Sequence, residues 1–90
     1  EAYILVNTEP GKPWEVADAS QKIEGIKMAH AVTGQFDVVA YADFIKMDDL
    51  GRIIQEIQSL QGVRRTQTVI AMPQPFENSI AKGINPNCSR

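Results

Sequence analysis

The chain has 90 residues, of which 43% are hydrophobic and 22% charged, and its formal net charge is −2. This length indicates a single domain, and the acidic balance argues against direct binding to nucleic acid. No apolar run approaches the roughly 18–20 residues that a membrane span needs, so we expect neither a membrane segment nor a signal peptide.

The first third of the chain predicts a strand, a loop and a helix. Residues 2–7 (AYILVN) are apolar and rich in β-favouring types, which is typical of a buried strand. The segment 8–13 (TEPGKP) has the composition of a loop, and Pro13 suits the first turn of a helix. Apolar residues at helical spacing predict that helix over 14–25, with Gly25 as its terminator.

A hairpin is predicted next. Residues 26–33 alternate in character, which predicts a strand with two different faces, and residues 36–44 predict a second strand. One face of the first strand is predicted to carry Ile26, Met28, His30 and Val32. Only Gly34 and Gln35 separate the strands, so we expect a two-residue turn in which Gly34 adopts a positive φ.

The clearest helix is predicted over 48–62. Its apolar stripe consists of Leu50, Ile53, Ile54, Ile57 and Leu60. Asp48 is expected to cap the first turn, and Gly62 to end the helix. Residues 62–72 then predict a last strand, rich in threonine and valine.

This order of elements predicts an α+β, ferredoxin-like β-α-β-β-α-β fold, with a four-stranded antiparallel sheet and two helices on one face. We assign residues 1–72 to this domain and 73–90 to a C-terminal extension, either loosely ordered or packed on a neighbouring subunit. Val39 and Tyr41 place apolar side chains on the face away from the helices. We therefore expect a second copy of the chain to cover that face and form a dimer.

Few residues suggest catalysis or metal binding. Cys88 is the single cysteine and His30 the single histidine, so we expect no internal disulfide, no metal, no cofactor and a reducing, cytoplasmic environment. His30 is more typical of a packed or interface histidine than of a catalytic one. The adjacent Arg64 and Arg65 are interpreted as part of an exposed strand or an oligomer contact.

Asp37 directly follows the predicted turn and precedes apolar residues. A carboxylate there reaches solvent, accepts backbone N–H bonds from the turn, or binds a ligand, and the pattern leaves all three open. Thr66 and Thr68 are predicted to share one side of the last strand with Arg64, although strand propensity alone also explains two threonines. Together these groups and the turn N–H groups form a plausible site for a zwitterion.

Two motifs resemble the C-terminal effector domain of the leucine-responsive regulator/AsnC (Lrp/AsnC) family, called RAM (regulation of amino acid metabolism). The family's T-G-x-[YF]-D turn and closing G-V-x-x-x-x-T strand correspond to Thr33, Gly34, Phe36 and Asp37, then Gly62, Val63 and Thr68. The resemblance covers residues 2–72. Phe36 stands where tyrosine is frequent, so any hydrogen bond from that phenol is absent.

The resemblance implies a non-enzymatic, amino-acid-binding and oligomerisation module of transcription regulation. Such domains dimerise through their sheets, and the dimers commonly form rings of eight or ten chains. The implied effector cleft lies between dimers and is lined by Thr33, Gly34, Gln35, Phe36, Asp37, Thr66 and Thr68. No helix-turn-helix is recognisable, so we expect the chain to be either a stand-alone protein or an excised effector domain. A stand-alone protein would co-assemble with full-length Lrp/AsnC regulators or sense amino acids in its own right.

Two other functions remain open. Small enzymes of the dimeric α+β barrel type, such as monooxygenases and isomerases, share this topology, and His30 and Trp14 are the only candidate catalytic residues for one. A purely structural assembly domain would have the same fold and oligomeric state. Ligand binding is the property that separates these functions from effector sensing.

Overall fold

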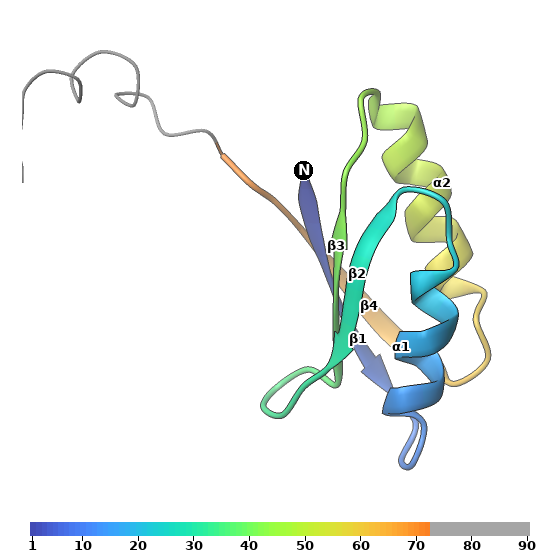
Figure 1. Ribbon diagram of the computed structural model, residues 1–90. Coiled ribbons are helices and arrows are strands. Elements are labelled where there is room, and N and C mark those ends of the chain that lie inside the picture. Colours follow the sequence, from blue (N-terminus) through green and yellow to red (C-terminus); the bar gives the residue numbers. More distant parts are fainter. Residues whose placement is uncertain (73–90) are drawn as a thin grey trace, which may run out of the picture.

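The structure is a computed structural model that describes residues 1–72, and the extension predicted over 73–90 lies outside these residues. The elements, in chain order, are β1 (Ala2–Thr8), α1 (Pro13–Gln21), β2 (Ile26–Ala31), β3 (Val38–Ala42), α2 (Met47–Gln58) and β4 (Val63–Ile70). The four strands form one antiparallel sheet in the order β2-β3-β1-β4. Both helices cover the same face of the sheet (Figure 1), which confirms the predicted ferredoxin-like fold.

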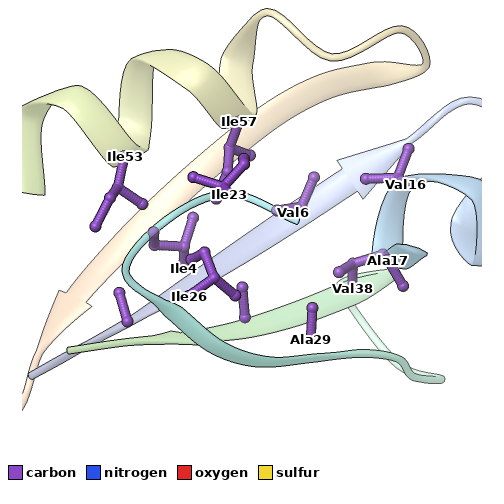
Figure 2. Packing of buried hydrophobic residues seen from close by; sticks show 12 residues of the cluster. Ile4, Val6, Val16, Ala17, Ile23, Ile26, Ala29, Val38, Ile53 and Ile57 are labelled. Carbon is purple, nitrogen blue, oxygen red and sulfur yellow. The ribbon is translucent and has the colours of Figure 1, made fainter. Parts of the chain in front are cut away.

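The core lies between the helices and the sheet (Figure 2). Ile4 and Val6 of β1 are fully buried because β1 is a central strand beneath both helices. Ile53 and Ile57 of α2 are also fully buried, as their spacing of four residues predicts. Ile54 and Leu60 pack against the edge of the same cluster, which confirms the predicted stripe. Within residues 1–72 neither helix is long and apolar enough to cross a membrane.

Both helices end earlier than predicted. Helix α1 ends at Gln21, where the amides of Lys22 and Ile23 bond to carbonyls three residues back and tighten the last turn. Helix α2 ends at Gln58 through similar bonds, so both predicted terminator glycines lie in the turns beyond. The predicted Asp48 cap is also wrong: Lys46 is the N-cap residue and no side chain caps the helix, while Asp48 lies in the first turn.

The predicted faces of β2 need correction. The pairing of β2 with β3 is irregular between Ile26 and Met28, so one extra residue interrupts the strict alternation. As a result, Ile26 and Ala29 both point into the core, whereas Met28 and His30 are exposed. The prediction that Ile26 shares a face with Met28 and His30 is therefore wrong, because a bulge changes the parity of every later position.

The hairpin connection is longer than predicted. The amide of Val32 donates to the carbonyl of Asp37 at 2.8 Å, so four residues, not two, connect the paired positions. Gly34 does adopt a positive φ, +119°, as expected for the residue that reverses the chain. The longer loop moves the start of β3 to Val38 and leaves Asp37 at the end of the sheet.

We call the sheet surface away from the helices the open face. One row of side chains crosses all four strands in register: Met28, Tyr41, Tyr3 and Val69. Met28, Tyr3 and Val69 are 46%, 40% and 42% exposed. Leu5 and Val39 are paired in the next row and are half-buried. His30 and Gln67 flank this second row, so the open face is largely apolar, and nothing in residues 1–72 covers it. Val39 and Tyr41 face away from the helices as predicted.

Candidate functional site

The candidate site lies at the end of the sheet where β1 ends and β3 begins. Asp37 is fixed there by three hydrogen bonds. Its amide donates to the carbonyl of Val6 at 2.9 Å, its carbonyl accepts from the amide of Val32, and its Oδ2 accepts from the amide of Thr8 at 2.8 Å. The carboxylate therefore has a defined position, and its Oδ1 accepts no hydrogen bond from the described residues.

The side chain of Asn7 connects β1 to the β2–β3 loop by a hydrogen bond. Its Nδ2 donates to the carbonyl of Gln35 at 2.8 Å. The other end of the same amide, Oδ1, is buried and has no hydrogen-bond partner among residues 1–72. A buried acceptor without a donor costs free energy, so Asn7 offers an unused acceptor at this end of the sheet.

Strand β4 supplies the positive charge of the site. Arg65 is the register partner of Asn7, and the pairing then becomes irregular, so that Thr8 pairs with Val63 and Arg64 is left out of the ladder. Both arginines are exposed. They border a cavity of about 410 Å³ that is lined by Asn7, Thr8, Asp37, Arg64 and Arg65.

The charges in this cavity are opposed but not paired. Among the described residues, neither arginine has a carboxylate oxygen within 4.0 Å. Asp37 instead accepts a backbone hydrogen bond from Thr8. A cavity lined by an unpaired carboxylate and by two cations is suited to a small zwitterion.

The predicted site residues separate into two groups. The loop residues Thr33, Gly34 and Gln35 are exposed and Phe36 is half-buried, beside Asp37 but outside the lining of the cavity. Thr66 and Thr68 are half-buried on the core-facing side of β4, where Thr66 Oγ1 accepts a 3.0 Å bond from Gln58 Nε2 of α2. Asp37 alone of the predicted set lines this cavity.

Arg64 does not share a side with the two threonines as predicted. The irregularity in the β1–β4 pairing places Val63 against the core, on the side of Thr66, while Arg64 is exposed. Sequence reasoning also missed Asn7 and Thr8. The available signal was a pair of polar residues, Asn7 and Thr8, at the end of an apolar strand, where side chains meet the ends of neighbouring strands.

A second cavity, of about 320 Å³, opens near the β3–α2 connection. Glu24, Asp43 and Asp49 give it an acidic rim, above Phe44 and Ile53. Arg52 is its single cation and already bonds to Glu56 at 3.1 Å and to the carbonyl of Glu24. Within residues 1–72 no group of three or more acidic, histidine or cysteine side chains is arranged to hold a metal ion.

The two residues considered for catalysis lie in different layers. His30 is exposed on β2 and pairs in register with Val39 on the open face. Trp14 is 73% exposed in the first turn of α1, which covers the opposite face of the sheet. The sheet thus separates them, and the geometry does not bring them to one site.

Comparison with known proteins gives matches over the whole described domain. The family model of the Lrp/AsnC ligand binding domain matches residues 1–80. The HTH-type transcriptional regulator LysM of Sulfurisphaera tokodaii is 29% identical over 72 residues, which are 79% of this chain and 51% of the regulator. The chain thus spans about half the length of such relatives.

Solved structures share the fold. The hypothetical protein PHS023 from Pyrococcus horikoshii has a TM-score of 0.72 and 28% identity, over 86% of this chain and 94% of that chain. The transcriptional regulator NMB0573 from Neisseria meningitidis, solved as a complex with L-Met, has a TM-score of 0.69 and 24% identity, over 81% and 49% of the two chains. This second likeness concerns the fold alone.

The family match extends beyond both motifs noted in the sequence, and the element order and sheet are those of the solved relatives. The chain belongs to the Lrp/AsnC ligand-binding domain family.

Proposed function

We propose that this domain binds an amino acid and couples that binding to the assembly of an Lrp/AsnC-type transcriptional regulator. The observation that carries the proposal is a cavity lined by Asp37, Arg64 and Arg65, which form no ion pair with one another. It adjoins the Thr33–Asp37 turn motif. The complex of NMB0573 with L-Met supports an amino acid as the class of ligand.

The ligand's two charged groups have separate partners in this proposal. The α-ammonium group donates to Oδ1 of Asp37, which accepts no hydrogen bond from the described residues. The α-carboxylate accepts from the guanidinium groups of Arg64 or Arg65. The remaining predicted residues, Thr33, Gly34, Gln35, Phe36, Thr66 and Thr68, contribute where a neighbouring dimer closes the cleft.

The open face is the proposed dimer interface. Its apolar row includes Tyr3, Tyr41 and Met28, which are exposed or half-buried in the single chain. A second copy would bury the part of these side chains that is still exposed, and burial stabilises the dimer by about 25 cal/mol per Å² of apolar area before entropic costs. Dimers then assemble into a ring of eight or ten chains.

The position of the cavity explains how ligand and assembly are linked. Asn7 and Arg65 are in register at one end of β1 and β4, on the same side of the sheet as Leu5 and Tyr3. The cavity thus lies at the margin of the open face. A ligand that binds one assembly better than another shifts the equilibrium by its difference in affinity, and a coupling of about 1–3 kcal/mol shifts it 5–150-fold.

In this proposal the domain is not an enzyme and does not itself contact DNA or membrane. DNA binding falls to a helix-turn-helix domain, either in the same polypeptide or in a full-length regulator that co-assembles with it. The relatives that carry the term HTH in their names support this division of labour. We place the protein in the cytoplasm, where both amino acids and the transcription machinery are found.

Calorimetric titration with each of the twenty amino acids, with sedimentation measured in parallel, tests the proposal. We expect at least one amino acid to bind and to change the assembly mass. Asp37→Asn should remove binding, whereas Asp18→Asn, which neutralises an exposed carboxylate on α1, should leave it unchanged. No binding by any amino acid, with constant mass, would refute the sensing function.

A further inference from the structure

We infer that the cavity selects amino acids with an acidic side chain, aspartate or glutamate. This inference rests on the proposed function and adds the class of ligand. It follows from the unequal charges of the residues that line the cavity: one is acidic, Asp37, and two are basic, Arg64 and Arg65. Arginine stays protonated at every physiological pH, so the lining carries one net positive charge.

The charges of the lining match the charges of an acidic amino acid group by group. Such a ligand carries one ammonium group and two carboxylates, so its net charge is −1. Asp37 supplies the acceptor for the ammonium group. Arg64 and Arg65 supply one cation for each carboxylate.

Neutral and basic amino acids leave this lining unbalanced. Once the α-carboxylate has paired with one of the two cations, a neutral side chain forms no ion pair with the other, so this ligand gains one charge-assisted interaction fewer. A basic side chain adds a third positive charge next to Arg64 and Arg65. We therefore expect affinity to fall in the order acidic, neutral, basic.

The two arginines are available for this role because nothing else in residues 1–72 neutralises them. The ion pairs of the described chain are Lys12–Glu15 and Arg52–Glu56, both on the helical layer. The carboxylate oxygen of Asp37 that is engaged accepts from Thr8, not from an arginine. The cavity volume of about 410 Å³ lies within the range of about 300–1,000 Å³ that is usual for small-molecule pockets.

Isosteric ligand pairs provide the sharpest experiment. Calorimetric titration of the full 90-residue chain with glutamate and glutamine, and with aspartate and asparagine, changes one carboxylate into a neutral amide of the same shape. We expect the acid to bind about tenfold tighter than its amide, the effect of one charge-assisted hydrogen bond in place of a neutral one. Glutarate, which lacks the ammonium group, should bind more weakly than glutamate.

Charge-removing variants test whether the arginines cause the preference. Arg64→Gln or Arg65→Gln leaves one cation for the α-carboxylate, so the glutamate-to-glutamine affinity ratio should fall to about one while glutamine still binds. Lys27→Gln removes an exposed positive charge from β2, at the far edge of the sheet from β4, and should keep the ratio. Raising the salt concentration should weaken glutamate binding more than glutamine binding.

The possible outcomes distinguish a failure of acidic selectivity from a failure of the proposed amino-acid sensing. A neutral amino acid that binds as tightly as glutamate, and loses binding in Asp37→Asn, would overturn acidic selectivity and leave the sensing function intact. An acidic preference that survives both arginine substitutions would also overturn it. Absence of binding by all amino acids would overturn both the selectivity and the proposed function.

Discussion

Tyr3 of β1 and Tyr41 of β3 are register partners on the open face, with ring centroids 5.2 Å apart and ring planes inclined by 49°. The centroid distance lies within the range of about 4.5–7 Å in which aromatic pairs attract one another. The pair lies in the middle of the row that crosses all four strands, between Met28 and Val69. Two phenol rings in contact at the centre of a face that residues 1–72 leave uncovered form a preassembled contact surface for a second sheet.

Val39→Lys should prevent dimerisation. Val39 is half-buried on the open face and pairs with Leu5 and His30, so a lysine there would place a charge inside the proposed interface. We expect sedimentation at micromolar concentration to show a folded monomer. Gln55→Lys, an exposed position on α2, is the matched control and should remain dimeric. A dimeric Val39→Lys variant would contradict assembly through the open face.

We expect the unfolding free energy of the domain to fall at alkaline pH, when the phenol of Tyr41 ionises. Burial, together with the nearby carboxylates of Glu1 and Asp43, raises the pKa of Tyr41 above 10.0. The folded state therefore holds this proton more tightly than the unfolded state, so the stabilisation is complete below pH 10 and is lost as pH rises through the folded-state pKa.

Urea unfolding at pH 9 and pH 11 measures this effect. The decline in unfolding free energy between the two values should be smaller in Tyr41→Phe than in the unmodified chain, because phenylalanine has no proton to lose. Tyr3→Phe retains Tyr41 and removes only the smallest of the influences on its pKa, so most of the decline should remain. Equal declines in all three proteins would show that Tyr41 does not contribute.

Asp37 should contribute to stability as well as to binding. Its Oδ2 accepts a hydrogen bond from the amide of Thr8, a residue that is only 8% exposed. Asp37→Ala leaves this donor without a partner and should lower the unfolding free energy by about 1–3 kcal/mol. Asp37→Asn keeps an acceptor and should cost less. Equal losses in the two variants, measured by chemical denaturation, would contradict the role of the hydrogen bond.

Gly25 and Gly34 should differ in their tolerance of alanine although both have positive φ, +101° and +119°. A Cβ at Gly34 meets no atom within 4 Å, so Gly34→Ala should cost only the backbone term of about 1–2 kcal/mol. A Cβ at Gly25 would lie 2.6 Å from Cδ1 of the fully buried Ile53, which adds about 1–3 kcal/mol of overpacking.

A double-mutant cycle isolates the steric part of this difference. Ile53→Val removes Cδ1, the atom that the new Cβ would meet. The cost of Gly25→Ala, measured by denaturant unfolding, should therefore be smaller in the Ile53→Val background, whereas the cost of Gly34→Ala should not change. Additive effects of Gly25→Ala and Ile53→Val would exclude the clash.

Periodicity predicted the order and type of every element because local patterns encode them: the stripe through Ile53 and Ile57 specifies α2, and the alternation around Val39 specifies β3. The two bulges could not be predicted this way. Each bulge depends on which residue of the partner strand lies opposite. Each also changes which residues of its strand point to the core and which to the open face, from Met28 in β2 and from Arg64 in β4.

The candidate site was predicted only in part for a related reason. Asp37 could be singled out in the sequence because a carboxylate between a turn and an apolar strand must reach solvent, accept hydrogen bonds or bind a ligand. Asn7 and Arg65 are 58 positions apart in the chain and come together only through the β1–β4 register. Strand pairing brings together the three chain segments that form the cavity. The sequence of one segment does not indicate which other segment it pairs with.

The order β2-β3-β1-β4 also constrains how the polypeptide is made. β1 is the first strand to leave the ribosome, yet one of its two neighbours is β4, and Ala2 pairs with Ile70. The nascent chain therefore cannot complete its sheet until translation has passed residue 70. β3 can pair with one edge of β1 before then, but the edge that β4 will occupy stays unpaired, and an unpaired apolar edge strand is open to pairing with other chains.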